Sequence, residues 1–362
     1  MARELTREKE RIDLNPREAV GPPRIIPTHR EGRVAPPRVL RSLHRRALMF
    51  VCAAKGVATH LPPVGAIVQR RSRGSDDARY CYSVWLRHLV VAHRSGFCRK
   101  SLPSTIAELG PGDSFGVGLA ALLCGAERYH AFDCVASASA ERNLAIFDRL
   151  VELFEARANI PGPDEFPLIK PLLENYAFPH DLLTPERLAQ SLAPARVARL
   201  RRALETLDES VFTYCAPWPG GGAASSGLAG AVDMIVSQAV MLYADDLVGL
   251  YAEQAAWLKP GGFMSHQLEF TALNFAAEWN GHWTYSDALW RLVTGNRSYV
   301  PNRAPHSAHV EAIEAAGLHL VTDWKVMRPS AVKRAHLAPR FSALSRADLT
   351  TSATCIQAVK PP

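Results

Sequence analysis

A glycine-rich turn between a short apolar strand and an apolar helix constrains this chain more than any other feature. The segment Glu108 to Gly118 reads ELGPGDSFGVG and continues from strand-like residues at 106–109. Glycines at such a turn let the backbone adopt positive φ and let a ligand approach the main chain closely. A second strand is expected at 128–134, after the helix at 117–124. This order of elements predicts the start of a doubly wound α/β sheet.

Further apolar segments continue the same pattern along the chain. Strands are expected at residues 211–216, 232–237, 262–270, 318–325 and 353–359, with a helix at 245–258. Apolar side chains at helical spacing in residues 78–100 predict an amphipathic helix that leads into the sheet. No internal repeat is present.

The chain divides into three parts by composition. Residues 1–46 contain six prolines and 18 charges, so we expect a basic, disordered arm. Residues 47–100 are expected to form a helical extension. Residues 101–362 are expected to form the α/β domain, with insertions at about 145–210 and 271–310.

Charge and cysteine content limit the location and the partners. Residues 1–100 carry 21 basic and 8 acidic side chains, so the net charge of +7 arises in the first third of the chain. A solvated basic leader, nucleic acid or an anionic membrane surface would each suit this charge. Residues 47–68 are too interrupted by polar residues and prolines to span a bilayer. The seven cysteines form no CxxC pair, which disfavours zinc and disulfides and favours a cytoplasmic location.

Two classes of cofactor use a glycine turn of this kind. A dinucleotide places its pyrophosphate against the turn, where Glu108 and Asp113 would be unfavourable, and the spacing here is GxGxxxG rather than GxGxxG. S-adenosylmethionine carries an ammonium and a sulfonium, which suit the carboxylate of Glu108. Asp133 ends the second strand, where an acid binds ribose hydroxyls in either class. The residues therefore favour S-adenosylmethionine over NAD.

The segment from about residue 78 to 360 resembles the class I S-adenosylmethionine-dependent methyltransferases. ELGPGDSFGVG is similar to the first motif of that family, AFD at 131–133 to the second-strand acid, DMIVSQAVMLYADDL to the fourth-strand region and WLKPGG to the turn into strand five. The resemblance implies a seven-stranded Rossmann-like sheet of order 3-2-1-4-5-7-6, with the last strand antiparallel. The cofactor-binding residues that it implies are Glu108, Gly110, Gly112, Asp133, Ser237 and Gln238.

The same resemblance places the acceptor after strand five. Residues 265–309 are similar to a subgroup of bacterial methyltransferases that share an SHxL/I-acid segment and a later N-R-x-x-x-S stretch. His266 is the candidate general base and Glu269 the residue that orients it, although a packed histidine and a helix cap are the alternatives. His282, Tyr285, Asn302 and Arg303 are candidate substrate-binding residues. An internal ion pair is the alternative for Arg303, and core packing is the alternative for the aromatic residues of this region.

Three functions follow from these expectations. The first is O-methylation of a hydroxyl on a small molecule or glycan, favoured by the polar, aromatic insertion. The second is RNA methylation with the basic first third as an electrostatic arm, although no RNA-binding module and no NPPY-like tetrapeptide is recognisable. The third is a non-catalytic protein of the same fold that binds a partner.

Overall fold

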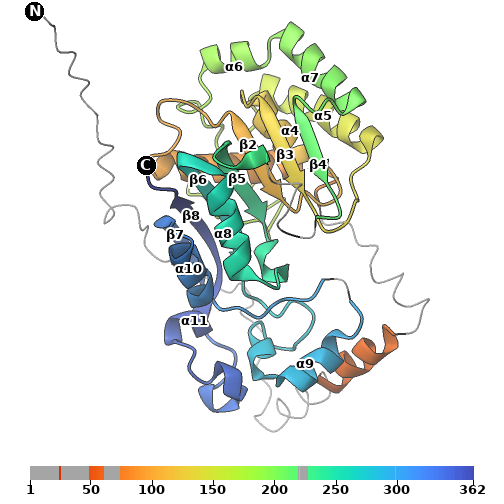
Figure 1. The fold of residues 1–362 in the computed structure, drawn as a ribbon, viewed down its shortest axis with the longest axis vertical. Helices are drawn as coiled ribbons and strands as arrows, with labels where there is room; N and C mark the ends of the chain where they lie inside the picture. The colour runs from red at the N-terminus through yellow and green to blue at the C-terminus, as the bar shows by residue number, and fades with distance from the viewer. Residues whose placement is uncertain (1–23, 26–48, 61–73, 219, 221–226, 298) are drawn as a thin grey trace, which may run out of the picture.

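The computed structural model describes residues 24–25, 49–60, 74–218, 220, 227–297 and 299–362 (Figure 1). The arm expected at residues 1–46 therefore lies outside the described residues, apart from the two-residue strand β1 (Arg24–Ile25).

A single mixed sheet organises the described residues. Its strands after β1 are β2 (Thr105–Leu109), β3 (Arg128–Phe132), β4 (Phe212–Cys215), β5 (Val232–Gln238), β6 (Leu258–Glu269), β7 (His319–Met327) and β8 (Thr351–Val359). The order across the sheet is β1-β7-β8-β6-β5-β2-β3-β4. Strand β8 is antiparallel to β6 and β7, and the other pairs are parallel. Counted from β2, this order is 3-2-1-4-5-7-6, so the predicted fold class is confirmed.

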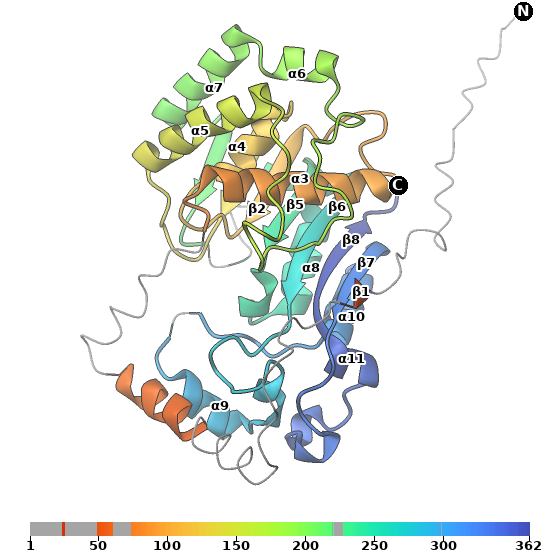
Figure 2. The ribbon, with the colours of Figure 1, turned by 180° about the vertical axis from the view of Figure 1, so that it is seen from behind.

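Helices cover both faces of the sheet. The helices are α3 (Ala78–Arg94), α4 (Gly116–Leu123), α5 (Ala140–Glu155), α6 (Pro185–Ser191), α7 (Pro194–Thr206), α8 (Leu247–Trp257), α9 (Asp287–Thr294), α10 (His306–Ala315) and α11 (Arg346–Thr350). Figure 1 shows α8 and α10 in front of the sheet, and Figure 2 shows α3 crossing the opposite face. Each face carries its own core of buried apolar side chains. The expected helix at 78–100 is thus the one that covers the face opposite α8.

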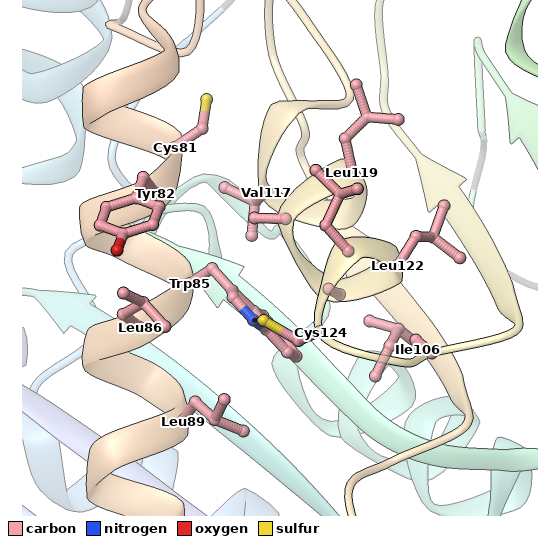
Figure 3. Close-up of a cluster of buried hydrophobic side chains, with 14 of the residues drawn as sticks. Cys81, Tyr82, Trp85, Leu86, Leu89, Ile106, Val117, Leu119, Leu122 and Cys124 are labelled. Atoms are coloured by element: carbon pink, nitrogen blue, oxygen red, sulfur yellow. Dashed lines mark hydrogen bonds between the residues drawn. The ribbon is translucent and has the colours of Figure 1, made fainter. Parts of the chain in front are cut away.

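Two glycines of the turn serve helix packing. Figure 3 shows α3 lying against α4, with Trp85 next to Cys124; the Trp85 Nε1 atom donates to that sulfur at 3.2 Å. A Cβ atom at Gly116 would lie 2.3 Å from the Cys81 sulfur, and one at Gly118 would lie 2.1 Å from the Tyr129 ring. Side chains at these positions would therefore push α4 away from α3 and from the sheet.

The insertion at 145–210 comprises most of α5, then α6 and α7, with an irregular segment between α5 and α6. The buried guanidinium of Arg87 on α3 fixes this segment by donating to the carbonyl oxygens of Pro161 and Ile169, each at 2.8 Å. These carbonyls lie outside any helix or strand and would otherwise be buried without a hydrogen-bond donor. Arg87 therefore supplies the donors that regular secondary structure does not.

The second insertion packs against a helix from the N-terminal extension. Residues 49–58 are helical and lie beside α9 in both views (Figures 1 and 2). Their apolar side chains share a cluster with Phe275, Trp290 and Val293. We call residues 49–60 together with 271–305 the insertion lobe. Since residue 271 follows β6 closely, the lobe begins at the carboxyl end of a central strand.

Candidate functional site

The turn after β2 adopts the conformation that its glycines predict. Gly110 has φ +69° and Gly112 has φ +74°. The Gly110 nitrogen donates to the carbonyl of Phe132 at 2.8 Å, which joins the turn to the end of β3. A Cβ atom at Gly110 would lie 2.5 Å from the Cγ2 atom of Val240, which follows β5. The turn therefore lies against the segment after β5, at the point where the chain order in the sheet reverses and where doubly wound folds bind ligands.

Asp133 stands directly beside this turn. Its Oδ2 atom accepts from the Gly112 nitrogen at 3.1 Å, and its Oδ1 atom accepts from the Val135 nitrogen at 3.2 Å. A carboxylate has about four acceptor positions, so two amide donors leave capacity for hydroxyl donors. Asp133 and the glycine turn thus form one unit at the carboxyl edge of β2 and β3.

Trp218 closes the neighbouring side of this unit. Its backbone nitrogen donates to the Asp133 carbonyl at 2.7 Å, and its ring packs on Phe132 and Trp257. The indole Nε1 atom is buried without a hydrogen-bond partner. An aromatic ring beside the strand-end acid suits a planar base.

The amides at the start of α4 are bonded to protein side chains. The Asp113 nitrogen donates to Ser75 Oγ at 2.8 Å, and the Phe115 nitrogen donates to Asn143 Oδ1 at 2.9 Å. The Gly116 nitrogen donates to Ser114 Oγ at 3.0 Å. A pyrophosphate bound at a helix N-terminus uses amides of this kind. Their existing bonds argue against a dinucleotide at this turn.

Glu108 lies inside the sheet face that α4 covers. The Tyr129 hydroxyl donates to its Oε2 atom at 2.5 Å. Burial, with a smaller contribution from the charge of Asp133, raises the pKa of Glu108 to about 8. A carboxyl that is largely protonated near neutral pH is a weak counter-charge for a sulfonium. Contact between Glu108 and the cofactor stays a prediction, and this geometry favours a structural role.

The predicted residues at the end of β5 point to opposite faces. Ser237 Oγ lies 2.8 Å from His266 Nδ1 on the face that α8 covers. Gln238 Oε1 lies 3.1 Å from His88 Nε2, and Gln238 Nε2 donates to the Lys170 carbonyl at 3.1 Å. Neither contact involves the glycine turn, so their binding of the cofactor also stays a prediction.

His266 is enclosed by protein groups on both sides of its ring. Beyond the Ser237 contact, its Nε2 atom lies 2.7 Å from Gln254 Oε1 on α8. The side chain is fully buried, and burial lowers the pKa of His266 to about 3. Both nitrogens join β6 to its neighbours, which favours the packing alternative over the predicted role as general base.

Glu269 lies three residues further on and has a different partner. Its Oε2 atom accepts from Lys170 Nζ at 2.8 Å. The Glu269 side chain is 15% exposed and the Lys170 side chain is 16% exposed. The structure therefore brings Glu269 to the irregular segment after α5 and not to His266. Of the two predicted catalytic residues, Glu269 is the one with a side chain that solvent reaches.

The predicted substrate residues are mostly framework of the insertion lobe. Arg303 is 5% exposed, pairs with Asp287 and lies between the rings of Trp290 and Phe341, with 5.0 Å from its Cζ atom to each centroid. Its Nη1 atom donates to the Tyr285 carbonyl at 2.9 Å. The internal ion pair that the sequence left open for Arg303 is therefore present.

His282 and Asn302 are equally enclosed. His282 is buried against Trp283, and its Nδ1 atom has no hydrogen-bond partner. The Asn302 amide donates to the carbonyls of Met241 at 3.0 Å and Ala244 at 2.8 Å, which anchors the turn after β5. Asn302 thus acts on the cofactor region by holding the chain that follows Val240.

Sequence reasoning missed residues that join the lobe to the carboxyl edge of the sheet. The Tyr299 ring lies 5.7 Å from that of Tyr243, edge to face, and Cys134 Sγ donates to the Tyr299 hydroxyl at 3.9 Å. Cys134 is the residue after Asp133.

No cluster of three metal-ligating side chains occurs among the residues that the structure describes. Within the same ranges, no helix is long and apolar enough to cross a membrane.

Comparison with other proteins gives similarity in structure alone. No family model matches the sequence, and no curated protein matches it. One similar structure is the complex of the Haloferax volcanii Trm112 methyltransferase activator with a protein assigned as a methyltransferase; it is 17% identical, with 79% of this chain and 94% of that chain covered and a TM-score of 0.34.

Two further similar structures contain a cofactor or its product. Phosphoethanolamine N-methyltransferase 2 of Haemonchus contortus with S-adenosyl-L-methionine is 13% identical, with 80% and 59% of the two chains covered and a TM-score of 0.38. Geranyl diphosphate C-methyltransferase of Streptomyces coelicolor with S-adenosyl-L-homocysteine is 13% identical, with 74% and 77% covered and a TM-score of 0.34. What this chain does is therefore inferred from its own residues.

Proposed function

We propose that this chain is an S-adenosylmethionine-dependent methyltransferase. The observation that carries the proposal is the unit formed by Asp133 and the positive-φ turn at Gly110 and Gly112, joined by the 3.1 Å hydrogen bond to the Gly112 nitrogen. It lies at the point where the order of the strands reverses, between β2 and β5. A strand-end carboxylate beside a glycine turn is the arrangement that binds a ribose and the group attached to it.

The hydrogen bonds of the turn decide between the two cofactor classes. S-adenosylmethionine has no phosphate, so it needs no row of amides at the start of α4. The side chains of Ser75, Asn143 and Ser114 take up amides there. The NAD alternative would require at least some of these bonds to break, at a cost of about 1 kcal/mol for each.

The residues present fit the cofactor, with Asp133 toward the ribose hydroxyls and the Trp218 ring beside the base. When bound, the cofactor supplies an electrophilic methyl group on its sulfonium. The chain must hold the acceptor in line with that methyl group and exclude water, and such positioning is worth roughly 7–11 kcal/mol. Tyr243 and Tyr299, which reach the carboxyl edge from the turn after β5 and from the lobe, are placed to line the acceptor side.

The acceptor that we propose is a hydroxyl on a small molecule or a glycan. A hydroxyl must lose its proton on methylation, and a positioned base accelerates such a step by roughly 10²–10⁴. Glu269 is the predicted catalytic residue that remains accessible, and its Oε2 atom pairs with Lys170 Nζ at 2.8 Å. Glu269 would accept the proton that the acceptor hydroxyl loses on methylation.

Binding and turnover test this proposal separately. The purified chain is titrated with S-adenosylmethionine and with NAD by calorimetry, and the expected result is saturable binding of S-adenosylmethionine alone. Radiolabelled methyl transfer is then measured with pools of small hydroxyl compounds, oligosaccharides and RNA. Binding of NAD, or of neither compound, would overturn the cofactor assignment. Transfer to RNA with none to the hydroxyl pools would replace the proposed acceptor.

A further inference from the structure

The helix at residues 49–58 is apolar on both of its faces. Its inner face carries Met49, Cys52, Ala53 and Gly56, and a Cβ atom at Gly56 would lie 2.0 Å from the Leu292 carbonyl oxygen of α9. Its outer face carries Phe50, Ala54 and Val57 at positions i, i+4 and i+7. A helix without a polar face is normally buried on all sides, so its outer face lacks the partner that its composition requires.

The outer face is strongly exposed. Phe50 is 75% exposed and Val57 is 53% exposed, with Val51 beside them at 43%. Leu292 of α9, whose carbonyl meets Gly56, is 46% exposed. Large apolar side chains that are exposed on two helices packed against each other are typical of an interaction surface. We call these four residues the apolar ridge.

The sequence on either side of this helix carries charge of one sign. From Gly32 to Ser75 the sequence contains nine lysine and arginine residues and no aspartate or glutamate. In the sequence Arg45 and Arg46 stand four and three positions before Met49, and Lys55 is exposed on the helix itself. Apolar side chains flanked by basic residues fit a bilayer surface that carries anionic headgroups.

We propose that the apolar ridge docks this protein on an anionic membrane surface. Phe50, Val51, Val57 and Leu292 enter the boundary between headgroups and acyl chains, and Lys55 contacts the phosphates. The basic residues that flank the helix in the sequence add to the attraction for an anionic surface. The ten described helical residues, 49–58, are fewer than the roughly 20 apolar residues that cross a bilayer, so the proposed contact is interfacial. A second copy of the chain would meet like charge on both sides of the interface, and a nucleic acid offers nothing to bury the apolar side chains.

Vesicle flotation of the full-length chain tests the proposal. The protein is expected to float with vesicles of phosphatidylcholine mixed with phosphatidylglycerol and not with phosphatidylcholine alone, and added salt is expected to weaken the binding. Phe50→Ser combined with Val57→Ser should lower the bound fraction about tenfold or more. Arg45→Gln and Arg46→Gln should each lower it about fivefold.

A matched control separates the ridge from exposure in general. Leu168 lies in the irregular segment between α5 and α6 and is 85% exposed, so Leu168→Ser removes an exposed apolar side chain elsewhere and should leave flotation unchanged. Since Phe50, Val57 and Leu168 are exposed, the melting temperature should stay constant in the variants that replace them. Absence of flotation in the parent chain, or flotation that the double variant does not reduce, would overturn the proposal. So would a dimer in solution that Phe50→Ser dissociates, because the ridge would then cover a second copy.

Discussion

The backbone nitrogen of Gly112 donates a 3.1 Å hydrogen bond to the carboxylate of Asp133, which ties the turn after β2 to the end of β3. The two residues are 21 positions apart in sequence and follow two neighbouring parallel strands. The positive φ of Gly112 turns its amide toward the carboxylate, and a residue other than glycine would resist that conformation. One hydrogen bond therefore sets both the shape of the turn and the orientation of the acid.

Replacing Asp133 tests its proposed contact with the cofactor. Asp133→Asn keeps an oxygen for the Gly112 amide but loses the charge, so the turn should stay folded while S-adenosylmethionine affinity falls about tenfold or more. Calorimetric titration measures the affinity, and thermal melting checks the fold. Asp164→Asn, at an exposed position, is the control. Equal affinity in Asp133→Asn and the parent chain would remove Asp133 from the cofactor site.

Gly110 is constrained by its neighbour as well as by its backbone. In Gly110→Ala the new methyl group would meet the Val240 side chain and would also oppose a φ of +69°, which costs about 1–2 kcal/mol. We expect weaker S-adenosylmethionine binding and a lower melting temperature. Adding Val240→Ala should relieve the steric part of the loss, and Val240→Ala alone gives the baseline. A double variant no better than Gly110→Ala would assign the whole effect to the backbone.

The sequence predicted the sheet because its signals are local. Apolar runs and the glycine turn located the strands, the resemblance implied their order and the antiparallel β8, and Gly110 and Asp133 lie at the expected strand ends. The first two glycines of the turn adopt positive φ, but Gly116 and Gly118 make room for Cys81 and Tyr129. That second use depends on packing with α3 and β3, which no local pattern contains.

Side-chain roles were harder to predict because they depend on partners distant in sequence. His266 follows Ser265 at a strand end, as a catalytic base would, but the Gln254 side chain of α8 encloses its ring. The guanidinium of Arg303 is a group that could bind an anionic substrate, but it forms an ion pair with Asp287 within the lobe. In both cases the burial of the side chain decided between two chemically reasonable roles. Periodicity in the sequence predicts which face of a helix or strand is buried, but not which partners a buried side chain meets.

His266 is expected to act on stability rather than on turnover. His266→Ala would leave Ser237 Oγ and Gln254 Oε1 without their ring partner in a dry interior and would open a cavity. The free energy of unfolding should fall by about 2–4 kcal/mol. Denaturant unfolding measures this loss, and methyl transfer per folded molecule should be unchanged. A folded variant with parent stability and slow turnover would instead restore His266 as the base.

Several buried histidines make stability depend on pH. Burial lowers the pKa of four of them from 6.5 to about 4 for His88 and about 3 for His266, His282 and His309. Between pH 6.5 and about 4 the unfolded chain binds protons that the folded chain does not, so stability falls as the pH falls. Glu108, with its pKa raised to about 8, opposes this trend as a single group.

Between pH 6.5 and 4 the free energy of unfolding is expected to fall by about 1 kcal/mol or more per pH unit. Denaturant unfolding at several pH values measures this slope. His266→Gln, whose amide can still bond Ser237 and Gln254, should reduce the slope because one titrating group is gone. His319→Gln, at an exposed position, should leave the slope unchanged. Stability that is constant from pH 6.5 to 4 would contradict the burial of these rings.

Gly56 decides whether the helix at residues 49–58 stays on the insertion lobe. A Cβ atom there would lie 2.0 Å from the Leu292 carbonyl oxygen and 2.6 Å from that of Val293, and both are backbone atoms that cannot move aside as a flexible side chain would. Gly56→Ala should therefore separate the helix from α9 although alanine is the better helix former, by about 1 kcal/mol. Ala54→Gly, on the exposed face of the same helix, lowers helix propensity without touching α9.

Hydrogen exchange of the amides in residues 49–58 distinguishes contact from propensity. If the contact with α9 holds the helix, Gly56→Ala should lose protection there and Ala54→Gly should lose less, while the amides of β5 and β6 keep theirs. Because Asn296 donates to Thr59 Oγ1 at 2.9 Å, the amide of Asn296 should lose protection together with the helix in Gly56→Ala. Greater loss in Ala54→Gly than in Gly56→Ala would show that propensity, and not the close approach of the two helices, maintains this part of the lobe.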